Sequence, residues 1–483
     1  MKTTPYLLVI GLLCWSCQAP QDRFEDALCI ENVSTIDAES GLQENRTLII
    51  QDNKILKNVP SADLNLHPDN EIIDGTGKFV IPGLWDAHVH FSFLEELAPA
   101  MFDLFLSYGI TSLRDTGGEI GFVKKWKDES EANPSTKPRL MIAGPLMDGM
   151  PNVYDGSDPQ HPPLSVGLGS VEDAVKMVDY LDSMGVDLLK AYEMLSPEQF
   201  VAVTARAREK GLKVTGHIPL SMDVASASNA GLNSMEHLRN VEMSMAGDSD
   251  ELLNIRRAML KAGQSKKGGV LRSSLHNAQR MTAIANIDPV NKQKVIEILA
   301  KNGTWQIPTL VLPKTFTLKY YASEEWQESY KFLPKDIEKM WLEQTEIASA
   351  SETTPDALKY QKWMSDITRE MHAGGVVFMA GTDTPISFQT PGLSLHKELE
   401  LFVDAGMSPL EALGSATWRP AQYFGLEGEL GLLKAGMIAD LLLLDANPLE
   451  QISNTKKIHA IVKDGNYMGP DAIKALQEKL IAQ

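Results

Sequence analysis

The middle of the chain, from residue 81 to about residue 425, repeats one pattern: a brief apolar run is followed by a longer stretch with helical spacing. We count eight such runs, which lie at Gly83–Ala87, Ile110–Leu113, Leu140–Ala143, Asp187–Leu189, Lys213–Gly216, Ser234–Glu236, Trp305–Leu310 and Val376–Gly381. Strands that alternate with helices pair in parallel, and eight such units are typical of a TIM-type barrel. The sequence therefore predicts an α/β fold with a (β/α)8 barrel over residues 81–425.

Both ends of the chain have a different, β-rich pattern. Residues 27–80 alternate short apolar runs with turn pairs such as Asp52-Asn53, and residues 426–470 return to this style, with Asp464-Gly465 as a hairpin turn. We expect the two ends to pair into one small β-sandwich outside the barrel. Residues 471–483 have helical spacing and are predicted to form a terminal helix.

Two long gaps separate strands of the predicted barrel. They run from Arg239 to Thr304 and from Val311 to Gly375, and both carry helix-like stretches rich in Lys, Glu and Met. Insertions of this length between barrel strands are expected to form a lid or a wall over one mouth of the barrel.

The first residues have the pattern of an export signal. Lys2 precedes an apolar run from Tyr6 to Trp15, and Ser16-Cys17 follows it. The run is shorter than the ~20 residues that span a bilayer as a helix, but it suits the core of a signal peptide. A small residue before Cys17 resembles a bacterial lipobox, in which the signal is cut and the thiol acylated. We expect residues 1–17 to be a signal peptide with a lipobox, and the protein to be an exported, membrane-anchored lipoprotein of the cell envelope, in the periplasm or on the outer surface. The alternative is an ordinary cleaved signal.

Composition excludes other classes of protein. The chain has 45 Lys+Arg against 64 Asp+Glu, which gives a net charge of −19 and argues against a nucleic-acid-binding surface. Its three cysteines all precede residue 30 and are too few for a disulfide scaffold. Cys29 is expected to be a small buried hydrophobe.

A His-x-His pair closes the first predicted barrel strand. Side chains alternate along a strand, so His88 and His90 point to the same side. Two neutral imidazoles aimed at one point are half of a metal site. Such a pair also occurs by accident in cores and on surfaces, but the carboxyl ends of barrel strands are where barrel enzymes place their chemistry.

Four more strand ends carry residues of interest: His217 on the fifth strand, His237 on the sixth, Asp383 on the eighth and Lys190 on the fourth. Each histidine alone could be structural, and Asp383 alone could be a helix N-cap. Their gathering at one face favours a metal. An unpaired ammonium beside two cations would be repelled, so either no metal lies there or Lys190 is chemically changed. Carboxylation by CO₂ would turn it into a carboxylate that can bridge two metals.

With these segments the chain resembles the amidohydrolase superfamily, in its imidazolonepropionase-like and prolidase-like branch. The matching stretches, which span residues 27 to about 468, are His88/His90, residues 109–115, Lys190, His217, Glu236-His237, residues 381–383, residues 396–399 and residues 416–440. The resemblance implies a β-sandwich beside a (β/α)8 barrel. It also implies a binuclear centre, with one metal on His88, His90 and Asp383, the other on His217 and His237, and carboxylated Lys190 between them. Zinc is the expected metal, and manganese, iron or cobalt would be tolerated.

The ligand set implies hydrolysis of an amide- or peptide-type C–N bond in a small substrate. A metal-bridging hydroxide would attack the carbonyl, with Asp383 as general base and then general acid. The prolidase-like branch suggests a dipeptide or an N-acyl amino acid, and cyclic amides and lactones are also compatible. Tyr192, Arg114 and His396 are expected substrate contacts. The alternatives are core packing, a salt bridge from Arg114 to Asp115, and a solvated helix start at His396. Contact with a membrane is expected only through the lipid anchor, and a homo-oligomer is left open.

Two other functions stay open. A mononuclear deaminase or an imidazolonepropionase would lack the bridging lysine, and deaminases carry a glutamate three residues after the fifth-strand histidine, where this chain has Leu220. A non-catalytic lipoprotein that binds a small ligand would be expected to have lost metal ligands, and all six are present here.

Overall fold

The structure is a computed structural model that describes residues 21–157, 159 and 161–482. The predicted signal peptide and lipobox, residues 1–17, lie outside the described residues. Within the described part of the chain, no helix combines the length and the apolar character that crossing a membrane requires.

The middle of the chain alternates parallel strands with helices, as predicted. The inner strands are β6 (Leu84–Val89), β7 (Ile110–Asp115), β8 (Arg139–Ile142), β11 (Leu188–Ala191), β12 (Lys213–Gly216), β13 (Ser234–Glu236) and β14 (Trp305–Ile307). They fall into two sheets, with the orders β6-β7-β8 and β10-β9-β11-β12-β13-β14. All their pairings are parallel, and their residues are almost all buried, as expected for strands covered on both faces. The strands β9 (Leu146–Gly149) and β10 (Ser165–Leu168) were not predicted.

The eighth predicted strand, residues 376–381, is not a regular strand. Phe378 forms one parallel bridge to Gln306 of β14, and the amide of Ala87 in β6 donates to the carbonyl of Ala380 at 2.9 Å. The segment thus lies between β14 and β6, but its bonds are isolated. The two sheets are not closed into one ladder, so the closed barrel stays a prediction.

Helices follow these strands and cover them. The ones outside the long insertions are α1 (Ala98–Ser107), α2 (Ile120–Ala132), α3 (Val171–Ser183), α4 (Pro197–Lys210), α5 (Val224–Asn229), α14 (Leu393–Asp404), α15 (Pro409–Ser415) and α16 (Trp418–Phe424). α4 shows why they begin and end where they do. Ser196 and Gln199 form a reciprocal capping box at its start, and Gly211 ends it with a φ of 73°.

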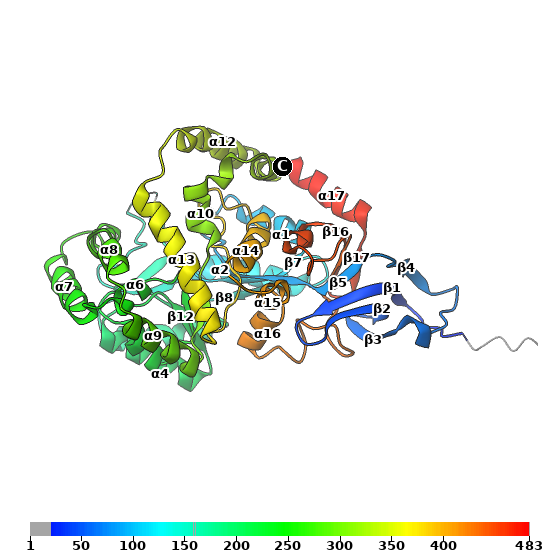
Figure 1. Ribbon diagram of the computed structural model, residues 1–483, viewed down its shortest axis with the longest axis horizontal. Helices are drawn as coiled ribbons and strands as arrows, with labels where there is room; N and C mark the ends of the chain where they lie inside the picture. The colour runs from blue at the N-terminus through cyan, green and yellow to red at the C-terminus, as the bar shows by residue number, and fades with distance from the viewer. Residues whose placement is uncertain (1–20, 158, 160, 483) are drawn as a thin grey trace, which may run out of the picture.

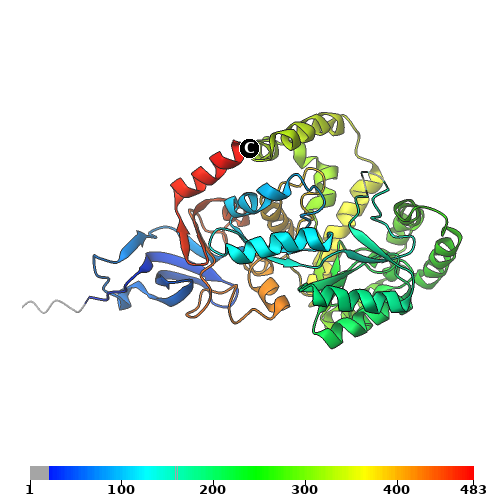
Figure 2. The same cartoon turned by 180° about the vertical axis from the view of Figure 1, so that it is seen from behind.

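Both long insertions are helical. The first holds α6 (Val241–Met245), α7 (Ser249–Ala262), α8 (Gly268–Ala285) and α9 (Pro289–Asn302), and the second holds α10 (Val311–Leu318), α11 (Glu324–Tyr330), α12 (Lys335–Ser349) and α13 (Pro355–Ala373). α7 and α8 lie at the end of the molecule that is far from the first strands (Figures 1 and 2). Short 3₁₀ turns are present at Ser61–Asp63, Tyr320–Ala322 and Ile452–Lys456.

The two ends of the chain share one sheet, whose order is β17-β16-β15-β5-β1-β2-β3, with β4 also on β1. Its strands are β1 (Ala27–Asp37), β2 (Gly41–Gln51), β3 (Lys54–Pro60), β4 (Glu71–Asp74), β5 (Phe79–Pro82), β15 (Leu441–Leu444), β16 (Ile458–Lys463) and β17 (Asn466–Met468). β15 joins the ends by pairing antiparallel with β5. The pairing of the ends is as expected, while a second facing sheet, and hence a sandwich, stays a prediction.

Two smaller expectations about these ends are confirmed. Cys29 is fully buried in β1, and burial raises the pKa of its thiol to about 11, so it behaves as a small hydrophobe. The terminal helix is α17 (Pro470–Ile481), and Lys479 on it pairs with Asp103 of α1 at 2.6 Å.

Two hairpin turns from opposite ends of the sequence meet in this sheet. Asn53, in the β2–β3 turn, donates its side-chain amide to Asp464 in the β16–β17 turn at 3.0 Å. Gly465 has a φ of 81°, and a Cβ there would lie 1.9 Å from the carbonyl oxygen of Asp52. Only glycine therefore fits this turn against its neighbour.

We expect Gly465→Ala to lower the free energy of unfolding by more than the ~1–2 kcal/mol that a left-handed φ costs an L-residue, because its methyl group also meets Asp52. Gly77→Ala is the matched control, since its φ is 73° and no atom lies within 4 Å of a Cβ there. Urea unfolding of both variants measures the difference. Equal losses at the two positions would contradict the contact between the turns.

Candidate metal centre

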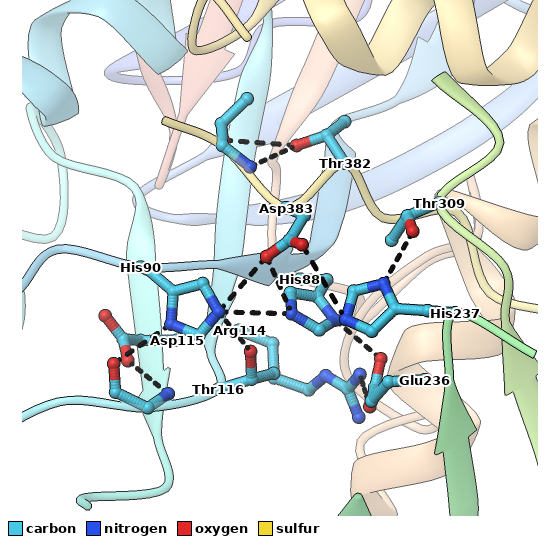
Figure 3. A network of polar contacts seen from close by, with 12 residues as sticks. His88, His90, Arg114, Asp115, Thr116, Glu236, His237, Thr309, Thr382 and Asp383 are labelled. Carbon is cyan, nitrogen blue, oxygen red and sulfur yellow. Dashed lines mark hydrogen bonds and ion pairs between the residues drawn. The ribbon is translucent and has the colours of Figure 1, made fainter. Parts of the chain in front are cut away.

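Three predicted ligands from two distant parts of the chain meet at the end of β6. Ligand atoms of His88, His90 and Asp383 all lie within 4.8 Å of one another (Figure 3). Oδ1 of Asp383 is 3.2 Å from Nε2 of each histidine, and the two Nε2 atoms are 3.2 Å apart. Asp383 is held there by its own amide, which donates to the carbonyl of His88 at 2.8 Å.

The hydrogen bonds around these histidines fix their tautomers. Nδ1 of His88 lies 2.6 Å from Oε2 of Glu236, and Nδ1 of His90 lies 3.0 Å from the carbonyl of Gly117. Both acceptors lack a proton to give, so each Nδ1 donates, and Nε2 is the nitrogen that is left to bind a metal. The two Nε2 atoms and Oδ1 of Asp383 thus face one point. Two imidazole nitrogens and a carboxylate oxygen that converge on one buried point are the donors that divalent metals take in proteins, so the site fits such an ion.

His217 and His237 are prepared in the same way on the other side of Asp383. Nδ1 of His217 donates to Glu193 at 2.6 Å, and Nδ1 of His237 donates to Thr309 at 2.7 Å. The hydroxyl of Thr309 itself donates to a carbonyl, so it can only accept from the ring. Burial lowers the pKa of His217 to about 3 and holds that of His237 well below its ordinary value. Both are neutral imidazoles with a free Nε2, which is the form that binds a metal.

Lys190 lies in the same cavity and is 1% exposed. Its Nζ has no hydrogen-bond partner among the described residues. Burial lowers the pKa of this amine to about 8, although the charge of Glu236 opposes the change. A lysine of this kind is partly neutral near pH 7, and the neutral amine is the form that adds CO₂. The structure thus brings all six predicted metal ligands together, in surroundings that suit them.

Arg114 does not contact the cavity. It is fully buried below the site, where Nη2 donates to Glu236 at 2.7 Å and Nε donates to the carbonyl of Ala87 (Figure 3). The expected substrate contact is therefore corrected: Arg114 balances the charge of the carboxylate that orients His88. The salt bridge to Asp115 is also absent among the described residues, because Asp115 accepts from the amides of Phe91 and Gly117.

His396 is the second correction. It is fully buried on α14, with Nε2 2.9 Å from the carbonyl of Tyr108 and Nδ1 2.9 Å from the hydroxyl of Thr455. Both ring nitrogens are used to fasten α14 to neighbouring segments. His396 is a structural residue away from the cavity, neither a substrate contact nor a solvated helix start.

The cavity over the centre has a volume of about 160 Å³. Tyr192 lines it, as predicted, together with Phe93, Leu146, Tyr154, Leu164, Arg239, Arg272, Leu312 and Ile386. Arg272 lies on α8 and Leu312 on α10, so each long insertion supplies part of the wall.

Sequence reasoning missed the two arginines of this cavity. Arg272 donates from Nη1 to the hydroxyl of Tyr192 at 3.0 Å, while Nε of Arg239 is buried without a hydrogen-bond partner among the described residues. Arg239 follows His237 by two residues and could have been found at that strand end. Arg272 lies inside an insertion where no motif marks it.

We expect Arg114→Met to lower the free energy of unfolding by about 3–5 kcal/mol, because it leaves the carboxylate of Glu236 buried without its cation. Arg114→Met combined with Glu236→Gln should recover part of the loss, since the buried charge is then removed. Urea unfolding measures both. Unchanged stability with a raised KM would instead restore Arg114 as a substrate contact.

The sequence and the fold were compared with known proteins. The profile of the amidohydrolase family matches residues 79–468. An adenine deaminase from Desulforamulus reducens is 22% identical over 436 residues, which are 89% of this chain and 55% of that protein. An imidazolonepropionase from Rubrobacter xylanophilus is 38% identical over 108 residues, 21% of this chain and 25% of that protein. The chain thus spans about half the length of the first relative and a quarter of the second.

A solved structure shares the fold over almost the whole chain. A Xaa-Pro dipeptidase with methionine bound in its active site superposes with a TM-score of 0.66 at 20% identity, over 92% of this chain and all of that one. At this identity the likeness concerns the fold alone. The family profile covers most of the sequence, including the segments that bear all six predicted ligands. The chain belongs to the amidohydrolase family.

Proposed function

We propose that this chain is a metal-dependent hydrolase that cleaves an amide-type C–N bond in a small substrate. One observation carries the proposal: Nε2 of His88, Nε2 of His90 and Oδ1 of Asp383 converge on one buried point, and each ring is oriented by an acceptor at its Nδ1. Two imidazoles and a carboxylate in this arrangement are the donor set of a divalent metal ion.

The proposed centre holds two divalent metal ions, with zinc as the expected metal. His88, His90 and Asp383 would bind one ion, His217 and His237 the other, and Lys190, carboxylated by CO₂, would lie between them. Three features support this set: all six side chains line one cavity, each Nδ1 is tied to a neighbour, and Nζ of Lys190 has no partner among the described residues. Divalent ions, when bound, lower the pKa of water and polarise a carbonyl.

Asp383 is the proposed general base and acid. Its carboxyl group is buried among the ring nitrogens of His88, His90 and His237, and a divalent ion bound there would keep it ionised. Its Oδ1 faces His88 and His90, and its Oδ2 lies 3.7 Å from Nε2 of His237. One oxygen can therefore accept the proton of the attacking water and pass it to the departing nitrogen.

The proposed substrate is a dipeptide or an N-acyl amino acid, because the cavity offers cations opposite apolar side chains. Arg239 and Arg272 can pair with the free carboxylate, and guanidinium groups bind carboxylates in a matching planar geometry. Phe93, Leu146 and Leu164 provide an apolar wall. The volume of about 160 Å³ suits a small molecule.

Deamination is the second candidate, favoured by the similarity to an adenine deaminase. The position where deaminases carry a glutamate is Leu220, which is fully buried in a cluster with Leu271 and Leu275. The nearby Glu193 accepts hydrogen bonds from two histidines and is not free to move protons. These contacts support hydrolysis over deamination.

The proposal includes an architecture and a location. The central strands would close into a (β/α)8 barrel over residues 81–425, with a β-sandwich from residues 27–80 and 426–470. Residues 1–17 would direct export and attach the enzyme to a membrane of the cell envelope through Cys17.

We expect purified protein to contain two equivalents of divalent metal, and chelation to abolish hydrolysis that added zinc restores. Asp383→Asn, which cannot accept the proton, should lower kcat by about 10²–10⁴-fold. Elemental analysis and rates on a library of dipeptides and N-acyl amino acids measure this. A folded, metal-free protein that still hydrolyses substrate would refute the proposal, and cleavage of lactones or cyclic amides only would refute the substrate class.

Arg272→Met should raise KM for a substrate with a free carboxylate by about 10–100-fold, the loss of one hydrogen bond to a charged group. The amidated form of the same substrate should be affected far less. The control is Arg257→Met, an exposed arginine on α7 in the same insertion. The measurement is KM for both substrate forms, and an equal change for the two forms would mean that Arg272 does not bind the carboxylate.

A further inference from the structure

We propose that His276 on α8 is a positioning residue that acts through Glu193 on His217, so that an inserted helix sets how firmly the His217 side of the centre holds its metal. This inference rests on the proposed function, because it concerns the metal that His217 would bind. His276 and Glu193 do not line the substrate cavity, whereas His217 does.

Glu193 connects the two histidines with one carboxylate. It is fully buried, and its oxygens are divided between two donors. Oε1 lies 2.6 Å from Nδ1 of His217, and Oε2 lies 2.7 Å from Nε2 of His276. Both distances are short, as in hydrogen bonds to a charged acceptor.

The carboxylate of Glu193 determines which ring nitrogen of His217 and of His276 carries the proton. A carboxylate only accepts, so both imidazoles must donate to it. His276 then carries its proton on Nε2, which agrees with its Nδ1 being buried without a partner among the described residues. His217 carries its proton on Nδ1, and its Nε2 is left as a lone pair towards the cavity.

The helix that carries His276 is held against the same strand end by a second contact. Arg272 lies four residues earlier on α8, on the same face of the helix, and donates to Tyr192 at 3.0 Å. Tyr192 and Glu193 are consecutive residues after β11. Leu271 and Leu275 of α8 pack on Leu220, three residues after His217. α8 thus contacts the segment after β11, which carries Glu193, and the segment after β12, which carries His217.

Removing the His276 donor would leave Oε2 of Glu193 buried without a partner. A buried carboxylate oxygen in that state is costly, and the side chain would turn towards other donors. His217 would then lose the acceptor that fixes its tautomer and ring orientation. Changes in residues that orient a ligand histidine typically reduce metal affinity by about 10–100-fold.

The test is a zinc titration of the full chain in competition with a chromophoric chelator. His276→Leu should weaken one of the two zinc equivalents by about 10–100-fold and leave the other unchanged. His276→Gln keeps an Nε2–H donor and should retain most of the affinity. Asn277→Ala changes the exposed neighbour on α8 and is the matched control. Equal affinities for His276→Leu and the unsubstituted protein would overturn the inference.

A double-mutant cycle separates this role from a general loss of structure. Glu193→Gln cannot accept from both histidines and should itself weaken zinc binding. If His276 acts through Glu193, then adding His276→Leu to Glu193→Gln should change the affinity little further. Fully additive effects on zinc affinity would overturn the inference. So would a loss of zinc affinity in His276→Leu that is accompanied by a lower melting temperature of the metal-free protein and is not rescued in His276→Gln.

The same titration distinguishes this inference from the proposed function. If the unsubstituted protein binds no zinc or other divalent metal, both the proposed function and the role of His276 are refuted. If it binds two equivalents and His276→Leu binds them equally well, only the role of His276 falls.

Discussion

The structure depends on one electrostatic constraint, the presence of several electron-pair donors at a single buried point. His88, His90 and Asp383 bring two ring nitrogens and a carboxylate oxygen to 3.2 Å from one another, an arrangement that a bound cation would stabilise. The protein holds them there with rigid elements. Strand β6 carries His88 and ends one residue before His90, and the amide of Asp383 donates to the carbonyl of His88. The free energy of metal binding would thus be part of the stability of the fold.

A layer of acceptors behind the histidines is as specific as the ligands themselves. Each ring donates to a different partner: a carboxylate on β13 for His88, a carbonyl after β7 for His90, Glu193 for His217 and Thr309 for His237. Each of the two carboxylates of this layer has a further donor, Arg114 for Glu236 and His276 for Glu193. The centre is therefore set by residues from most of the central strands and from one insertion.

The positions of the candidate ligands could be predicted from the sequence better than their surroundings, for a physical reason. His88, His90, His217, His237 and Asp383 follow short apolar runs, and parallel strands bring such positions to one edge whatever the loops do. Arg272 and His276 reach the site from a helix inside an insertion, so their position depends on tertiary packing that no local pattern encodes. Arg114 and His396 were misplaced because periodicity shows that a residue is at a strand or helix, but not which buried partner satisfies its charge.

The fold was predicted in outline for the same reason. Seven inner strands and the shared sheet of the two ends follow from hydrophobic periodicity and turn pairs. The eighth strand was overestimated, since residues 376–381 make only isolated bridges. β9 and β10 were missed because they lie in a segment rich in Pro and Gly, whose turn pattern hides short strands.

The sheet that unites the two ends has a consequence for the time course of folding. Its two hairpin turns touch through Asn53 and Asp464, which are 411 residues apart. At a synthesis rate of ~5–20 residues per second, the first strands are complete roughly 20–80 s before their partners exist. During that interval the edge of β5 that later binds β15 is open, and an open edge is a template for pairing with other chains. Newly made chains therefore need protection at this edge until the last strands arrive.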